Sequence, residues 1–308
     1  MQGAIQSVSQ DQAVNERAKL IAAFAAIYIF WSGTFLAIRY VVAEVPPLLT
    51  IAIRCLGGAA ILFSWLAASG RIARPTAAEW RVAAAAGALL FVGCHGVLAW
   101  AEQRVSSGQA ALFMTSTPLG LVLLDGVRRG RLPPARVLAG LALGILGIAV
   151  LTYGTGGTSG TLLDRVALVL SGFSWAAGSL IARYGARPAS AAQSTAMQLA
   201  AGGAAVLAAS LVSGELSGWN PLETSPRAVA ALVFLVLFGT VVAFAAYTWL
   251  LRVTTPAAVG SSSFVNPVIA LGLAWAAGDE TISGRTLIAA ALVVGAVVLT
   301  RDTGKETA

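Results

Sequence analysis

The feature that most constrains this chain is a succession of ten apolar runs, each about as long as a membrane span. A helix needs about 20 mostly apolar residues to cross the hydrocarbon core of a bilayer. We therefore expect an all-α membrane protein with ten transmembrane helices. The predicted spans lie at 18–41, 47–69, 79–100, 107–126, 135–153, 163–184, 190–213, 227–250, 256–277 and 284–301.

The composition agrees with this prediction. Hydrophobic residues make up 57% of the chain and charged residues 11%, and the mean hydropathy is +0.81. Soluble domains usually carry about 25% charged residues. The formal net charge is +7, but the arginines gather at the ends of apolar runs and do not form a basic patch with interleaved aromatics, so we expect no nucleic-acid partner. The expected partners are the lipid bilayer and a small-molecule substrate, and we expect a monomer.

The basic residues also predict the orientation. Most of the 20 lysines and arginines fall in loops on the same side as the N-terminus, which the positive-inside rule assigns to the cytoplasm. Residues 1–17 are polar and lack the apolar core and cleavage site of a signal peptide. We therefore expect cytoplasmic tails at 1–17 and 302–308, with both termini inside.

The two halves of the chain resemble each other. The segment WSGTFLAIR at Trp31–Arg39 is echoed by WAAGSLIAR at Trp175–Arg183, an offset of 144 residues. The tetrapeptide RVSS that begins at Arg104 is echoed by RVTT from Arg252. Because each copy would hold an odd number of spans, the second must cross in the opposite sense, which gives inverted repeats. The expected units are 18–153 and 162–301, joined by the linker 154–161.

Several of these segments resemble a known family. FWSGTFLAIR at residues 30–39, and WAEQRVSSGQAA at 100–111 leading to Pro118, are similar to the first EamA repeat of the drug/metabolite transporter superfamily. Residues 175–183, 230–240 and 264–267 are similar to the second, so the resemblance spans roughly residues 20–300. It implies a ten-helix permease of the bacterial inner membrane that exports amino acids, metabolites or drugs from a central cavity. A Gly-Glu pair common after the fourth span of this family is replaced here by Arg129-Gly-Arg131.

Two prolines mark the predicted hinges. Pro118 leaves the carbonyl of Met114 without its helical partner, and Pro267 does the same to Ser263. In lipid such a carbonyl must find another donor or face a wet cavity. Short polar residues surround both prolines, so we expect bent helices at 107–126 and 256–277 that hinge and face the substrate. The alternative is a kink fixed only by packing.

Aromatic and polar residues predict the lining of a binding cavity. Tyr28, Trp31 and Phe35 are spaced by three and four residues, which places them on one helix face. Such a wall suits apolar, planar or cationic substrates, although packing is an alternative for each ring. The residues in the same lining, expected from the other spans, are Arg54, His95, Trp175, Tyr247, Ser262 and Asn266.

Ionisable residues inside spans point to further roles. His95 precedes Glu102 by seven residues, two turns along one helix face, and buried ionisable groups in membranes are costly. We expect proton coupling, where it exists, to use Glu102 with His95 as a relay. Alternatively, Glu102 lies at the outer interface paired with Arg104, and His95 is a neutral packing residue. Arg54 could contact a substrate carboxylate; Arg39 could do so too, or reach the interface.

The leading prediction for function is a transporter that exports small organic solutes by alternating access. A membrane scaffold or receptor without a transport cycle, and an intramembrane lipid-modifying enzyme, are the alternatives. The chain shows no phosphate-binding loop, nucleophile triad or metal cluster, and Cys55 and Cys94 both fall inside apolar runs. We therefore expect no enzyme, no metal and no cofactor.

Overall fold

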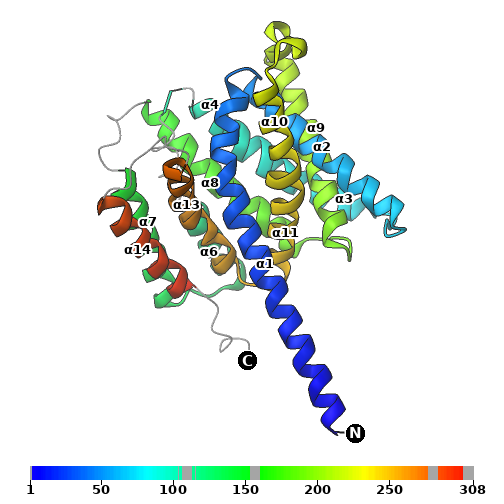
Figure 1. The fold of residues 1–308 in the computed structure, drawn as a ribbon, viewed down its shortest axis with the longest axis vertical. Helices are drawn as coiled ribbons and strands as arrows, with labels where there is room; N and C mark the ends of the chain where they lie inside the picture. The colour runs from blue at the N-terminus through cyan, green and yellow to red at the C-terminus, as the bar shows by residue number, and fades with distance from the viewer. Residues whose placement is uncertain are drawn as a thin grey trace.

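Every regular element in the described part of the chain is helical (Figure 1). The computed structural model describes residues 2–102, 104, 105, 113, 114, 116–152, 160–276 and 284–300. Within them, the side chains of residues 2–14 and of several others, including Phe35, Glu102 and Pro267, are outside the description. The helices are α1 Gln2–Val42, α2 Pro47–Ala68, α3 Ala77–Gly87, η1 Ala88–Gly96, α4 Val97–Glu102, α6 Ser116–Arg129, α7 Ala135–Thr152, α8 Leu162–Tyr184, α9 Ala191–Val212, η2 Glu215–Gly218, η3 Pro221–Glu223, α10 Pro226–Phe234, η4 Leu235–Val242, α11 Ala243–Val253, α12 Pro256–Gly260, α13 Ser262–Ala276 and α14 Gly284–Thr300.

In the part of the chain that the structure describes, six helical runs are long and apolar enough to cross a membrane. Two shorter apolar helices, Ala135–Val150 and Leu287–Thr300, fall within further predicted spans. The predicted spans 107–126 and 256–277 and the predicted linker 154–161 lie partly outside the described residues, so the number of ten stays a prediction. The six runs are Asn15–Val42, Pro47–Ala68, Ala77–Ala101, Leu162–Tyr184, Ala191–Val212 and Pro226–Val253.

The first helix is longer than the predicted span. The segment 1–17, expected as a polar tail, is helical from Gln2 onward and continues into the apolar part of α1. Figure 1 shows the N-terminal end of α1 projecting beyond the other helices. The apolar part packs against α10, η4, α11 and α13.

Polar residues at the loops fix where several helices begin. Thr76 and Glu79 form a reciprocal capping box at the start of α3. The helix α2 opens with Pro47, and its free amides at Leu48 and Leu49 donate to the carboxylate of Glu215, at 3.3 and 3.1 Å. This carboxylate compensates the amides that the first helical turn leaves without partners.

Small residues allow neighbouring helices to approach closely. A Cβ atom on Gly87 of α3 would lie 2.6 Å from the carbonyl oxygen of Gln198 and 2.9 Å from the amide nitrogen of Gly202, both on α9. No side chain fits in that space. Membrane helices use small residues in this way because lipid provides no hydrophobic drive for their association.

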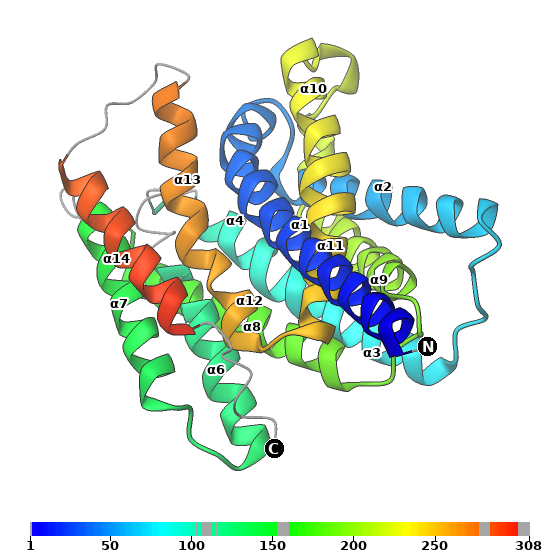
Figure 2. The ribbon, with the colours of Figure 1, turned by 60° about the horizontal axis from the view of Figure 1, so that its bottom comes forward.

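The packing pairs recur when the two halves of the chain are exchanged. Equivalent helices pair directly, α2 with α9 and α7 with α14. The helix α1 packs against α13 and the run α10–η4–α11, and its counterpart α8 packs against α6 and the run α3–η1–α4. Figures 1 and 2 both show α7 and α14 side by side.

Two segments of π-helix lie at corresponding places in the halves. η1 joins α3 to α4, and η4 joins α10 to α11. A π-helical turn carries one more residue than an α-helical one and is frequent at functional sites. Both segments contribute to the cavity described below.

The helix interruption in the predicted span 256–277 lies at Ser261, between α12 and α13. Pro267 is six positions further on and lies inside α13. Pro118 is buried and is the third residue of α6. Neither observation tests movement, so the hinge roles of these prolines stay predictions.

Candidate functional site

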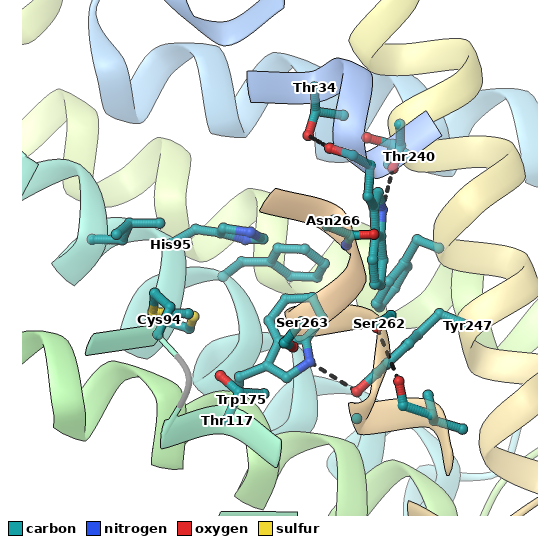
Figure 3. A pocket seen from close by; sticks show the side chains of 18 of the residues that line it. Thr34, Cys94, His95, Thr117, Trp175, Thr240, Tyr247, Ser262, Ser263 and Asn266 are labelled. Carbon is teal, nitrogen blue, oxygen red and sulfur yellow. Dashed lines mark hydrogen bonds between the residues drawn. The ribbon is translucent and has the colours of Figure 1, made fainter. Parts of the chain in front are cut away.

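A cavity of about 200 Å³ lies between helices of both halves (Figure 3). Its wall is formed by α1, α2, η1, α4, α6, α8, η4, α11, α12 and α13, together with Met114. The lining residues are Trp31, Thr34, Ile38, Arg54, Phe91, Cys94, His95, Leu98, Met114, Thr117, Leu121, Trp175, Gly239, Thr240, Phe244, Tyr247, Val259, Gly260, Ser262, Ser263 and Asn266.

Three aromatic rings form the centre of the wall. The ring of Trp31 meets that of Trp175 edge-on at 6.1 Å, and Tyr247 lies 5.1 and 5.5 Å from them. The indole nitrogen of Trp175 donates to the hydroxyl of Tyr247 at 2.8 Å, and Ser179 shares a 2.7 Å hydrogen bond with the same hydroxyl. The indole nitrogen of Trp175 and the hydroxyl of Tyr247 thus have partners within the wall. The apolar faces of the rings are left to contact one another and the cavity.

The segment η4 holds two lining residues of other helices in place. The backbone carbonyl of Gly239 accepts a 3.0 Å hydrogen bond from the indole nitrogen of Trp31. The hydroxyl of Thr240 accepts a 3.1 Å bond from Nε of Arg54. Adjacent residues of η4 therefore place an aromatic ring and a cation side by side.

Arg54 carries positive charge into this wall. Its side chain is partly exposed and lines the cavity. The described ion pairs join other residues, Lys19 with Glu16, Arg104 with Asp164, and Arg129 with Asp125. The lining formed by the described residues includes no aspartate or glutamate. Because an arginine stays protonated in proteins, the described part of this lining carries a cation without an acidic partner.

Three further lining residues have a buried polar atom without a hydrogen-bond partner among the described residues. These atoms are Nδ1 of His95, Oγ1 of Thr117 and Oδ1 of Asn266. The imidazole of His95 is held by rings, stacked 5.7 Å from Phe91 and edge-on 5.2 Å from Trp175. Buried polar atoms are normally bonded, so their clustering here is typical of a binding site.

The predicted site residues are distributed as follows. Trp31, Arg54, His95, Trp175, Tyr247, Ser262 and Asn266 lie in the cavity wall. Tyr28 is not among the lining residues, and its hydroxyl shares a 3.3 Å hydrogen bond with Ser261. The side chains of Phe35, Glu102 and Pro267 are outside the described residues.

Sequence reasoning missed several lining residues. Thr34, Thr117 and Thr240 are polar positions in apolar runs, and that contrast is a signal that could have found them. Phe91, Cys94 and Met114 carry no such signal, because apolar residues fill most of each run. Their position in the wall follows from packing.

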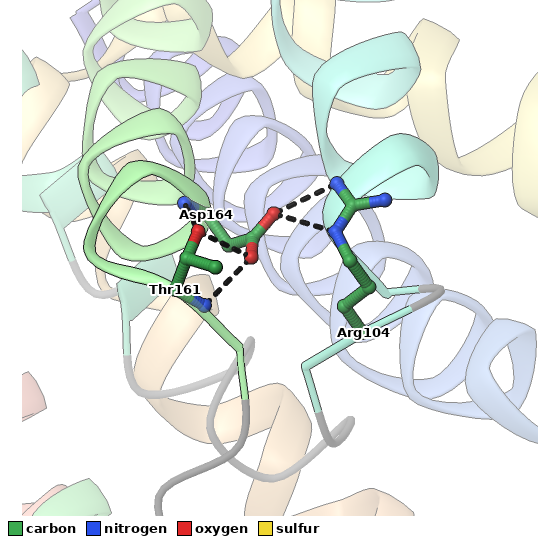
Figure 4. A network of polar contacts seen from close by, with 3 residues as sticks. All are labelled: Arg104, Thr161 and Asp164. Carbon is green, nitrogen blue, oxygen red and sulfur yellow. Dashed lines mark hydrogen bonds and ion pairs between the residues drawn. The ribbon is translucent and has the colours of Figure 1, made fainter.

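Arg104 forms an ion pair with Asp164. Its guanidinium binds Oδ1 of Asp164 through Nε at 2.9 Å and Nη2 at 2.7 Å (Figure 4). The other carboxylate oxygen accepts from the amide and hydroxyl of Thr161, both at 2.8 Å. Asp164, the acidic residue of the α8 capping box, thus also anchors the end of the α3–η1–α4 run. The alternative pairing of Arg104 with Glu102 stays a prediction, because the side chain of Glu102 lies outside the described residues.

Comparison with known proteins shows what this chain is related to. The model of the EamA-like transporter family matches it twice, over residues 18–153 and 165–301. The chain belongs to the EamA-like transporter family. It is 33% identical over 287 residues to the uncharacterized inner membrane transporter YedA of Escherichia coli K12, covering 91% of this chain and 90% of that protein.

Other relatives are more distant. A protein of Streptantibioticus cattleyicolor named as a probable terminal-alkyne amino-acid exporter is 25% identical, over 91% of this chain and 93% of its own. One crystal structure superposes with a TM-score of 0.76 at 23% identity, covering 92% of this chain and 96% of that chain, which shows the fold alone.

Family membership and the apolar helices identify a multi-pass inner-membrane transporter and not an enzyme. Within the residues that the structure describes, no group of three or more His, Cys, Asp or Glu could hold a metal ion.

Proposed function

We propose that this EamA transporter exports small organic solutes through the cavity between its halves by alternating access. The observation that carries the proposal is the cavity itself: both family repeats contribute aromatic and polar residues to its wall. A site at a repeat interface, near the middle of the spans, is where repeat-built transporters bind substrate.

The proposed architecture is ten spans in two inverted repeats, with both termini in the cytoplasm and one chain as the working unit. The same helix pairs are in contact when each helix is replaced by its counterpart in the other half, which supports a two-fold relation between the halves. The odd number of spans expected per repeat supports its inversion, and the distribution of basic residues supports the orientation.

The size and the lining of the cavity favour small solutes. Pockets that enclose drug-sized ligands measure about 300–1,000 Å³, and this cavity holds about 200 Å³. Its lining is mostly apolar and aromatic. A metabolite with one ring fits that description better than a large drug.

The position of the lining residues supports a state closed on one side. On α1 they run from Trp31 to Ile38, toward the helix C-terminus, and on the η1–α4 run from Phe91 to Leu98. One turn before Trp31, the hydroxyl of Tyr28 bonds that of Ser261 and ties α1 to the α12–α13 junction. In the proposed topology this contact lies on the cytoplasmic side and must open for substrate to enter.

Proton coupling is proposed to run through Glu102, with His95 as a relay. The place of His95 in the cavity wall supports its part. In liposomes, Glu102→Gln should remove the response to a pH gradient while substrate exchange continues. An unchanged response would remove Glu102 from the mechanism.

The transport proposal is tested with purified protein in liposomes. Saturable uptake of small labelled aromatic solutes is expected, because the cavity selects for size and rings. The matched control is Ser263→Trp, which places a large side chain in the cavity and should abolish uptake. Equal uptake by protein-free liposomes, or by the blocked variant, would contradict transport through this cavity.

A further inference from the structure

We infer that the cavity selects a small aromatic monocarboxylate in its anionic form, with the carboxylate on Arg54 and the ring against Trp31, Trp175 and Tyr247. The inference rests on the proposed function and names the substrate class of the same site. Nothing in the names of the relatives assigns an anionic cargo or a charge-recognising residue.

Arg54 places a positive charge in the cavity wall. A cation inside a membrane protein is costly unless an opposite charge or hydrogen-bond acceptors compensate it. The described residues compensate Arg54 with one neutral hydroxyl, that of Thr240, and no carboxylate. An anionic cargo would supply the missing charge each time it binds.

The guanidinium of Arg54 is oriented by its neighbours on η4. Its Nε proton is already donated to Thr240. Its Nη2 lies 3.8 Å from the point where a Cβ on Gly239 would stand, so the head group reaches the η4 wall beside Trp31. With Nε occupied, the two Nη groups are left as the paired donors that match the two oxygens of one carboxylate.

The described lining disfavours cationic substrates. An organic cation, or the ammonium of an amino acid, needs an anionic partner in a dry site. The described lining offers none, and the carbonyl of Gly239 already accepts from Trp31. Among the lining residues that the structure describes, Arg54 carries a positive charge, which repels an ammonium. This argues against the cationic cargo that the aromatic wall alone suggested.

The aromatic rings of the wall lie beside Arg54. Trp31 and Arg54 are held by the adjacent residues Gly239 and Thr240, so the cation and the aromatic cluster share one wall. Phe91 and Phe244 extend the cluster, with ring centroids 5.4 Å apart. A ring separated from its carboxylate by a short chain can touch both parts of the wall. The unpartnered Oγ1 of Thr117 and Nδ1 of His95 are further groups able to donate to the anion.

The test uses four ligands that share a phenyl ring and a short chain and differ in charge. They are 3-phenylpropanoate, 3-phenylpropanamide, 2-phenylethylamine and phenylalanine. Binding to the wild-type protein in detergent is measured by calorimetry at pH 7, where the carboxylate is ionised. The propanoate should bind about tenfold to a hundredfold more tightly than the amide, the value expected for hydrogen bonds between charged groups. Equal or tighter binding of the amide, the amine or phenylalanine, or binding of none of the four, would overturn the inference.

Variants identify the residue responsible. Arg54→Gln should remove the preference for the propanoate over the amide, and Arg54→Lys should keep part of it, since lysine retains the charge without the planar fork. The matched control is Arg227→Gln, because Arg227 is exposed and covers the ring of Tyr40 outside the cavity. A preference that survives Arg54→Gln in folded protein would also overturn the inference.

Uptake in liposomes separates the two proposals. Binding of the propanoate without its uptake would contradict the transport function and leave the anion site standing. Saturable uptake of the four ligands without preference for the propanoate would support transport and refute the anion site.

Discussion

Gly260 and Pro118 touch where α12 ends against the first described turn of α6. A Cβ atom on Gly260 would lie 3.1 Å from both Cα and Cβ of Pro118 and 3.2 Å from Leu121. Both residues belong to segments that the sequence predicts to bend, and Gly260, which lines the cavity, is followed directly by the break at Ser261. The two halves therefore meet at a joint in which only a glycine fits closely.

Gly260→Ala should disturb this joint. The added methyl meets the backbone of a proline, which cannot move aside like a flexible side chain, and overpacking of this kind costs about 1–3 kcal/mol. We expect a lower Tm in detergent and slower uptake in liposomes. The control is Gly272→Ala on α13, where a Cβ meets no described atom within 4 Å. Equal behaviour of the two variants would mean that the joint tolerates a methyl.

The prolines of the two halves should act as hinges. Pro118→Ala or Pro267→Ala restores a backbone donor, which should straighten one bend and stabilise one conformation. We expect slower turnover in liposomes with substrate affinity nearly unchanged. Paired measurements of affinity and turnover on each variant check this. If both variants turn over at the wild-type rate, the prolines are only kinks held by packing.

The two tryptophans should respond differently to truncation. Trp175 is 9% exposed and belongs to the main core cluster, whereas Trp31 is partly buried at its edge. Trp175→Ala should therefore cost about 3–5 kcal/mol and reduce the amount of folded protein, while Trp31→Ala should mainly reduce uptake. Fluorescence-detected gel filtration and uptake assays separate the two effects.

Phenylalanine substitutions test the contribution of the two rings without the empty space that alanine would leave. Trp31→Phe and Trp175→Phe keep an aromatic face but remove the indole donors to Gly239 and Tyr247. Both should fold, and both should transport more than the alanine variants. Loss of folded protein in Trp31→Ala as large as in Trp175→Ala would favour a packing role for both rings.

The sequence predicted some elements closely because polar residues or prolines mark their ends. The spans 47–69 and 163–184 compare with α2 Pro47–Ala68 and α8 Leu162–Tyr184, which begin at a proline and at a capping box. It did not predict η1 or η4, because a π-helical turn depends on how neighbouring helices pack and leaves no local pattern. The break at Ser261 was missed for a related reason: Thr255 caps α12, and the hydroxyl of Ser261 bonds back to Ala258 at 2.7 Å.

The candidate site was predictable in part. Trp31, Trp175, Tyr247 and Arg54 stand out as large or charged residues in apolar runs, and all four lie in the cavity wall. Their relative positions were not predictable, since the bond from Arg54 to Thr240 spans 186 positions in the chain. Contact with substrate stays a prediction for each of them.

The ion pair of Arg104 and Asp164 should stabilise the junction between the α3–η1–α4 run and α8. The side chain of Asp164 is 1% exposed, and Arg104→Gln leaves its carboxylate with the donors of Thr161 as its remaining partners among the described residues. We expect Tm to fall by about 2–4 °C, typical of the loss of one interaction. Asp164→Asn should give a similar loss, and the double variant should lose less than the sum because the residues share one interaction. Additive losses would show that the pair is not coupled.

The orientation of the halves can be tested with reporters. If both termini are cytoplasmic, alkaline phosphatase fused after Lys305 should be inactive, because it folds with its disulfides only outside the cytoplasm. The same enzyme inserted at 154–161 should be active, since five spans would separate that segment from the N-terminus. A fluorescent protein after Lys305, which matures in the cytoplasm, serves as the control for expression. An active fusion after Lys305 together with an inactive insertion at 154–161 would overturn the orientation. Equal activity at both sites would overturn the odd number of spans per repeat, and with it the inversion.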